Sequence, residues 1–288
     1  MHLIFKALFF CTGLVYSMGT QMLVLPTSAE ELSIGSHPTL SGLFSLNPAL
    51  IKANEKHPYL SLNRGNWLGD VSVSQIGYNQ MIDDNVVHLG IRYSGVSDLE
   101  FREEIPEDDP SSYFSAFGLA VDASTAFKYQ NHKLGLSLSY VQFTIFNEYS
   151  RGISFDIGYA FEMKNNYVLG IVAKDIGKMS KLDSKAPSLP NRLSAGISKK
   201  FQQNEYMNTI YGSLEWNSIP LTSKLYFGNH FKWNRLELLF GYATSNQTTE
   251  TSFGVGLNLN RYRVTYGTRF GSQDIGFPKL LSFNIILP

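Results

Sequence analysis

The most chemically versatile side chains of this sequence are charged residues that interrupt runs of alternating apolar residues. They are carboxylates such as Asp122, Asp156 and Glu162 and the basic residues Arg92, Lys128, Arg263 and Arg269. If each run is a β-strand with one apolar face, these side chains point to the opposite face, inside the protein. Opposite charges gathered in an interior form a structural polar network, which we favour, or line a transport pathway.

Motifs for catalysis are missing from the sequence. There is no Gly-x-Ser-x-Gly nucleophile elbow and no P-loop, and Gly254-Val255-Gly256 lacks the rest of a dinucleotide-binding fingerprint. The histidines show no spacing typical of metal ligands; they are His2, His37, His57, His88, His132 and His230. We therefore expect no catalytic residue, no metal site and no cofactor, and a protein that is not an enzyme.

Two segments between the apolar runs carry concentrated charge. Residues 95–114 include Glu100, Arg102, Glu103, Glu104, Glu107, Asp108 and Asp109, and residues 178–185 include Lys178, Lys181 and Lys185. Solvated loops are the simplest interpretation of both. The alternatives are docking of a partner or of divalent cations near lipopolysaccharide for the acidic loop, and contact with anionic lipid headgroups or an acidic partner for the basic loop.

Composition narrows the class of protein. The 288 residues carry 24 Lys+Arg and 24 Asp+Glu, and this zero formal charge argues against a nucleic-acid partner. Charged residues make up only 17% of the chain and aromatic residues 14%, which is less charge than soluble domains usually have. We infer that the chain exposes less surface to water than a soluble protein of its size.

The first nineteen residues have the three parts of a secretory signal peptide. A weakly basic start with Lys6 precedes a short apolar stretch, and the small residues Ser17 and Gly19 fit a cut after Gly19. The apolar stretch is about half the length that a membrane-spanning helix needs, so an N-terminal anchor is the weaker alternative. Cleavage would remove Cys11, the one cysteine of the chain.

From residue 57 onward, apolar residues recur with period two, which predicts strands. Ile153, Phe155, Ile157 and Tyr159 form one such series, and the residues between them are small or polar. We predict fourteen strands, at 57–63, 66–80, 85–94, 115–130, 132–146, 151–163, 166–175, 191–201, 205–217, 220–232, 235–243, 249–260, 261–270 and 279–287. Many reach the roughly 9–11 residues with which a tilted strand crosses a bilayer.

The segments that link the predicted strands alternate in length. The odd-numbered links include the long segments 95–114, 176–190 and 271–278, whereas the even-numbered links are tight turns such as the one at Asp83-Asp84-Asn85. Outer-membrane barrels have this asymmetry, with turns on the periplasmic side and longer loops outside. The sequence thus predicts an all-β fold, a closed antiparallel transmembrane β-barrel of about fourteen strands spanning residues 57–288.

An exported soluble β-sandwich is the alternative that also explains alternation. Its outward face would carry many long polar side chains, whereas here the second face is largely Gly, Ala and Ser, which suits a lumen that holds other protein. Aromatic residues near strand ends suit the girdles of a membrane barrel; they are Trp67, Tyr93, Tyr129, Tyr140, Trp233 and Tyr242.

Residues 20–56 precede the first strand and do not alternate. Thr27-Ser28-Ala29-Glu30 fits a capping box, and Asn47-Pro48 fits an N-cap followed by proline in a first helical turn. We expect residues 20–56 to form an N-terminal plug inside the lumen, with an arm outside the barrel as the alternative.

Several motifs in this order resemble the PorV/PorQ family of FadL-like outer-membrane barrels, PorQ in particular. They are Leu25-Pro26-Thr27-Ser28-Ala29, Gly35, Asn47-Pro48-Ala49-Leu50, Trp67-Leu68-Gly69-Asp70-Val71-Ser72, Leu189-Pro190 and Gly196-Ile197-Ser198-Lys199-Lys200-Phe201. The resemblance covers roughly residues 23–201. The sequence departs from the family where Gly35 is followed by Ser36-His37-Pro38 and where it ends in Leu287-Pro288 rather than in an aromatic residue.

The resemblance implies an outer-membrane protein that acts in type IX secretion and in cell-surface attachment of cargo by holding partner proteins. Its implied partners are attachment-complex proteins or secreted cargo with a C-terminal signal domain, besides outer-membrane lipid and lipopolysaccharide. The main alternative is a FadL-like channel for long-chain fatty acids or other hydrophobic small molecules. A structural exported β-protein is the third possibility.

Overall fold

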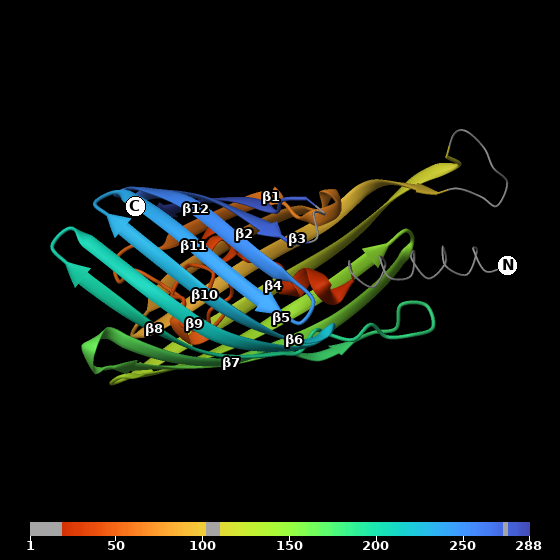
Figure 1. Ribbon diagram of the computed structural model, residues 1–288. Coiled ribbons are helices and arrows are strands. Elements are labelled where there is room, and N and C mark those ends of the chain that lie inside the picture. The colour runs from red at the N-terminus through yellow and green to blue at the C-terminus, as the bar shows by residue number, and fades with distance from the viewer. Residues whose placement is uncertain (1–18, 102–109, 273–275) are drawn as a thin grey trace.

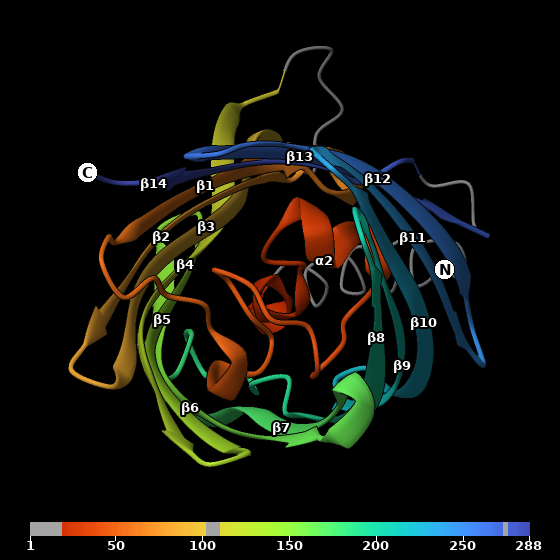
Figure 2. The ribbon, with the colours of Figure 1, turned by 90° about the vertical axis from the view of Figure 1, so that its left-hand side faces the viewer.

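The chain forms one closed antiparallel barrel, which confirms the predicted fold class (Figures 1 and 2). A computed structural model describes residues 19–101, 110–272 and 276–288. Within these residues each strand pairs with its neighbours in sequence, and the first strand pairs with the last. The strands are β1 (Tyr59–Asn66), β2 (Ser72–Ile82), β3 (Asn85–Phe101), β4 (Ser112–Tyr129), β5 (His132–Ile145), β6 (Glu148–Met163), β7 (Tyr167–Met179), β8 (Arg192–Gln203), β9 (Tyr206–Ser218), β10 (Leu221–Trp233), β11 (Leu236–Ser245), β12 (Thr249–Leu259), β13 (Tyr262–Gly271) and β14 (Lys279–Ile286).

The helices of the described residues are short. They are the 3-10 turns η1 (Thr20–Val24), η2 (Pro48–Leu50), η3 (Leu68–Asp70) and η4 (Lys164–Asn166) and the α-helix α2 (Ala29–Ile34). None of them has the length and the apolar sequence that a helical membrane span would need.

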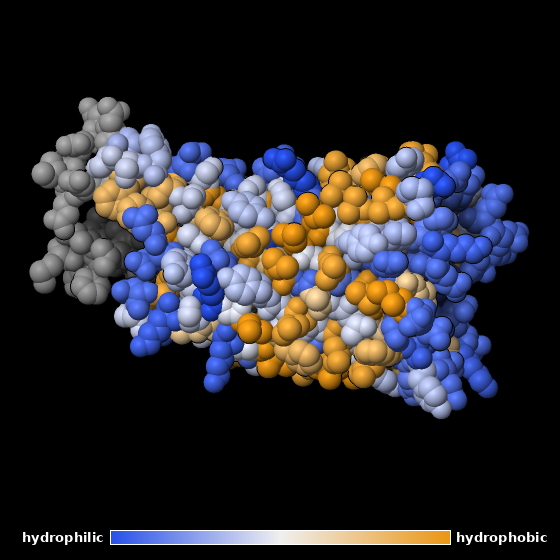
Figure 3. All heavy atoms as spheres, turned by 180° about the vertical axis from the view of Figure 1, so that it is seen from behind, coloured by the Kyte–Doolittle hydropathy of each residue, from blue (hydrophilic) through white to orange (hydrophobic). Residues whose placement is uncertain are grey.

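Large apolar side chains cover the outside of the wall. Ile153, Leu138 and Leu214 each expose more than half of their surface. In Figure 3 the hydrophobic residues gather in a band around the middle of the visible face, and hydrophilic residues lie toward the ends. Small and polar residues on the other face of each strand point inward, as the alternation predicts.

Two strand boundaries differ from the sequence prediction for local reasons. The second strand begins at Ser72 rather than at residue 66, because Trp67–Val71 forms a turn in which Gly69 has φ +67°. Trp67 consequently packs against Ala29 and Leu32 inside the barrel and is not part of the outer girdle. The third strand continues to Phe101, so that the β3–β4 hairpin projects beyond the rest of the barrel (Figure 1).

Tight turns connect the strands at one end of the barrel, which lies at the left in Figure 1 and which we call the turn end. Each turn contains a residue in the left-handed region, where Asn and Asp are tolerated better than most residues; they are Asp83, Gln130, Asn165, Asn204, Asn234 and Asn260. The opposite end carries the longer connections, and we call it the loop end.

Residues 20–56 lie within the ring of strands, which Figure 2 shows along the barrel axis. The segment starts at the loop end, where the Thr20 hydroxyl donates a hydrogen bond to the Ser188 carbonyl (2.6 Å). It leaves at the turn end, where β1 begins. Residues 1–18, which make up nearly all of the predicted signal peptide, lie outside the described residues.

Candidate functional site

Helix α2 is a part of the plug (residues 20–56) that lies against the barrel wall. Its N-cap is Ser28, whose hydroxyl accepts a hydrogen bond from the Glu31 backbone N–H (3.1 Å), while the Glu31 carboxylate accepts from the Thr27 backbone N–H (2.7 Å). The predicted capping box was therefore wrong by one residue, because the acid that caps the helix is Glu31 rather than Glu30. Glu30 is left to face the wall.

Glu30 joins an ion-pair network, which we call the latch, with residues of β10, β11 and β13. Arg263 donates to Glu30 (2.8 Å) and to Glu237 (2.6 Å), and the two ring nitrogens of His230 lie 3.1 Å from Glu30 and 2.8 Å from Glu237. Lys232 also contacts Glu237 (3.1 Å). Burial by itself raises the pKa of Glu30, but the charge of Arg263 and then His230 outweigh it and hold this pKa well below its ordinary value. Glu30 is therefore ionised at neutral pH and ties the plug to the wall.

A second network holds the start of the plug. Arg192 of β8 donates to Asp175 of β7 (2.9 Å) and to the Leu23 carbonyl (2.9 Å), which also accepts a longer hydrogen bond from Arg92 of β3 (3.3 Å). Lys174 pairs with Asp156 on the neighbouring strand (2.5 Å). The first residues of the plug are thus held from two sides of the wall.

The three carboxylates predicted from alternation pair with neighbours that the sequence did not indicate. Besides the Asp156–Lys174 pair, Asp122 lies 3.2 Å from His88 and Glu162 lies 2.6 Å from Lys133. Asp122 and Asp156 face the lumen as expected, whereas Glu162 is partly exposed near the turn end. Arg269 pairs with Glu250 (3.3 Å), and Lys128 is exposed. Charged side chains therefore do pair within the barrel, but which residues pair depends on the plug and on the register between strands.

The Asn47-Pro48 turn sits on two glycines of the wall. Asn47 caps η2 by accepting from the Ala49 backbone N–H (3.0 Å), as predicted, and its amide donates to the carbonyls of Pro38 (2.9 Å) and Tyr159 (3.0 Å). Gly135 and Gly158 are paired across β5 and β6, and a Cβ atom at either would overlap this turn. The motif is therefore a contact between plug and wall that requires glycine opposite it.

Two small cavities lie between the plug and the wall. One holds about 40 Å³ and is lined by the ion-paired groups around Asp122 and Arg192 together with apolar residues such as Leu25 and Phe44, and the other, beside Arg263, holds about 20 Å³. Each has room for little more than ordered water.

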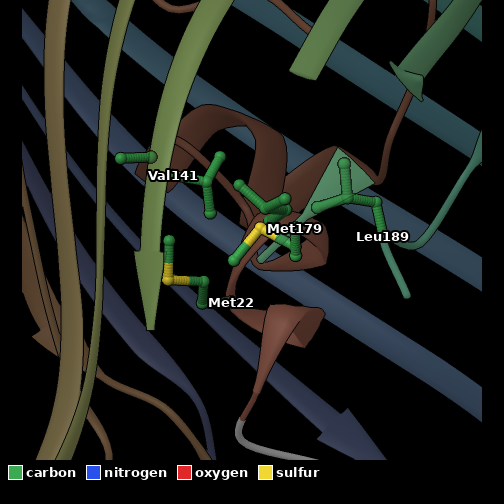
Figure 4. Close-up of a cluster of buried hydrophobic side chains, with 6 residues drawn as sticks. Met22, Val141, Met179 and Leu189 are labelled. Carbon is green, nitrogen blue, oxygen red and sulfur yellow. The ribbon is translucent and has the colours of Figure 1, made fainter. Parts of the chain in front are cut away.

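An apolar site lies between these cavities and the loop end of the barrel. Met22 and Leu23 of the plug pack with wall and loop residues, among them Val141, Met179 and Leu189, and Figure 4 shows four of these side chains turned toward one another. A hollow of about 350 Å³ opens beside the start of the plug, with Phe143, Leu182, Pro187 and Ile219 among its lining residues. We call it the mouth pocket. Its volume lies in the range typical of small-molecule sites.

Sequence analysis missed this apolar site. The available signal was the run of apolar residues from Met22 to Leu25, directly after the predicted cut and before Pro26. Of the two charged loops, the basic loop contributes Leu182 and Lys185 to the mouth pocket, whereas most of the acidic loop, residues 102–109, lies outside the described residues. Among the described residues, no three His, Cys, Asp or Glu side chains are grouped as a metal ion would require.

No protein-family model matches the sequence, and no curated protein matches it either. Solved structures of outer-membrane barrels match the fold. The Pseudomonas putida toluene transporter TodX superposes with a TM-score of 0.61 at 12% identity, over 89% of this chain and 96% of that chain. A Pseudomonas aeruginosa FadL homologue superposes with a TM-score of 0.59 at 11% identity, over 90% and 98%. This chain accordingly shares its barrel fold with these two proteins.

Proposed function

We propose that the protein is an outer-membrane channel that takes up small hydrophobic molecules. The observation that carries the proposal is the mouth pocket, which opens at the loop end and lies directly above the apolar residues of the plug. A hydrophobic molecule gains free energy by leaving water for such a pocket. The similar solved structures include the toluene transporter TodX, a mutant of which is described as a monoaromatic hydrocarbon channel, and this supports the choice over the secretion role.

Passage requires the plug to move, because the cavities below the mouth pocket hold only about 40 and 20 Å³. Few bonds hold the first plug residues at the mouth. Thr20 is bonded to Ser188, the Gln21 amide donates to the Ile219 carbonyl (2.7 Å), and Arg192 and Arg92 both donate to the Leu23 carbonyl. A ligand that displaces Met22 and Leu23 from their apolar partners would have to break these bonds in the same step.

The test is uptake of radiolabelled toluene and palmitate by cells that produce the protein, compared with cells that lack it. Leu182→Glu places a charge in the mouth pocket and is expected to lower uptake at least about tenfold, since the charge opposes apolar occupancy. Leu221→Glu, an exposed site at the same end, is the matched control. Uptake by the wild type that does not exceed the background of cells without the protein would refute the proposal.

The role in type IX secretion remains a second proposal, and one observation favours it. The β3–β4 hairpin and the adjacent β5–β6 turn expose the aromatic side chains of Phe101, Tyr113 and Phe146, a surface that suits a protein partner. Purification from mildly solubilised outer membrane should then recover secretion proteins or cargo with a shared C-terminal domain. Recovery of only a bound hydrophobic ligand would count against it.

A further inference from the structure

The outer wall near the loop end carries four exposed basic residues, which we call the basic patch: Arg151 on β6, Lys178 on β7, and Lys181 and Lys185 in the β7–β8 loop. Two exposed carboxylates, Glu148 and Asp183, lie near it in sequence. The patch keeps an excess of positive charge.

The strand register fixes the height of the patch on the wall. Along the outer face of β6, the exposed apolar residues Phe155 and Ile153 are followed by Arg151. On β7, Lys178 lies opposite Ile153, so the change from apolar to basic comes two residues earlier on β7 than on β6, where Arg151 follows Ile153. Tyr140 lies opposite Ile153 on the other side and is also exposed. Tyrosine and basic residues at the edge of an apolar band mark the level of lipid headgroups.

A hollow lies beside the patch because two strands part there. The ladder between β7 and β8 ends at Lys174–Arg192, so within the described residues Ile176–Met179 pairs with a strand only on the β6 side. The hollow along this edge holds about 330 Å³, with Lys178, Ser188 and Asn191 among its lining residues. An unpaired strand edge presents backbone N–H and C=O groups, which can bind hydroxyl groups.

We propose that the basic patch and this hollow bind the phosphorylated sugar headgroup of an outer-leaflet glycolipid. Arg151 and Lys178 bind phosphate, for which guanidinium and ammonium groups are well suited. The strand edge, Ser188 and Asn191 offer partners for sugar hydroxyls, and the acyl chains lie along Ile153 and Ile176 on the apolar wall. The hollow adjoins the mouth pocket, with which it shares Pro187 and Ser188, but binding of a headgroup there does not depend on the uptake of hydrophobic molecules.

The test compares two probes, bis-phosphorylated lipid A and its dephosphorylated form, for binding to the purified full-length protein in a neutral detergent. The wild type is expected to bind the phosphorylated probe at least about tenfold more tightly, given the contribution of each basic residue near an anionic headgroup. The triple variant Arg151→Glu, Lys178→Glu, Lys181→Glu is expected to lose this preference. Lys164→Glu, in the turn at the far end of the same hairpin, is the matched control and should retain it.

Heat-modifiable gel mobility shows that each variant is folded before it is tested. Equal binding of the two probes by the wild type would overturn the proposal. So would a folded triple variant that still prefers the phosphorylated probe, or a Lys164→Glu variant that loses the preference to the same degree.

Discussion

The latch predicts both the direction and the size of the effect that substitutions of its residues have on how firmly the plug is held. Replacing Arg263 by Met leaves Glu30 and Glu237 in the lumen with His230 and Lys232 as their ion-pair partners among the described residues. Removing one partner of a buried ion pair costs about 3–5 kcal/mol, and the 20% exposure of the Arg263 side chain places this case near about 3 kcal/mol. Replacing Glu30 by Gln is milder, about 1.5 kcal/mol, because Arg263 keeps Glu237 as a partner.

In the Arg263→Met background the effect of Glu30→Gln should reverse. Glu30 is then a buried carboxylate that faces Glu237 without its strongest cation, so neutralising it removes both a desolvation cost and a like-charge repulsion. The double variant is expected to hold its plug more firmly than Arg263→Met alone.

The assay is thiol labelling of a reporter cysteine in the plug. Thr39→Cys suits this purpose, because Thr39 is 5% exposed and its hydroxyl makes no hydrogen bond within the described structure. At about 1.4 kcal/mol for each tenfold change, labelling should accelerate about 100-fold in Arg263→Met and about 10-fold in Glu30→Gln. The exposed Gln247→Cys is a control whose labelling should not change. A double variant that labels faster than Arg263→Met would refute the assignment of Glu30 as an uncompensated charge.

Two further predictions concern the plug. Gly158→Leu should displace the Asn47 turn and expose the Thr39→Cys reporter, whereas Gly212→Ala, where a Cβ atom meets nothing within 4 Å, should leave labelling unchanged; equal labelling of both would contradict the glycine seat. Burial lowers the pKa of His37 from 6.5 to about 4. Between these pH values the folded state therefore binds fewer protons than the unfolded state. The contribution of His37 to the free energy of unfolding is complete above pH 6.5 and falls as the pH drops toward 4. The loss should approach about 3 kcal/mol in urea unfolding followed by tryptophan fluorescence, and a His37→Gln variant with the same pH dependence would exclude His37 as its cause.

The strands of the barrel wall could be predicted because the patterns that identify them involve only residues that are neighbours in sequence. Alternation with period two identifies a strand with one apolar side, and Asn or Asp at Asp83 and Asn234 identifies turns, without knowledge of any distant residue. Boundaries failed where a local turn interrupted the pattern, as at Trp67–Val71. The Asn47-Pro48 turn was predictable for the same reason, since a cap and a proline are neighbours in sequence.

The site was less predictable because its contacts join distant residues. Glu30 and Arg263 are 233 residues apart, and nothing in the sequence near Glu30 distinguishes its wall-facing role from that of Glu31. The pairing of Asp122 with His88 depends on strand register, which alternation does not determine. The mouth pocket exists only because the β7–β8 loop and the start of the plug meet.

Helix α2 bears on how the ring of strands closes during assembly. The closing ladder joins Tyr59 to Ile286, which are 227 residues apart, and bringing such ends together costs about 5 kcal/mol of chain entropy. The plug spans this seam: Gln75 of β2 donates to the Pro26 carbonyl, Ser282 of β14 accepts from the Ala29 backbone N–H (2.8 Å), and Leu32 packs with Val73 and Leu280. A segment that contacts strands on both sides of the seam is expected to lower the entropic cost of joining β1 to β14, so the plug bears on closure of the barrel as well as on passage through it.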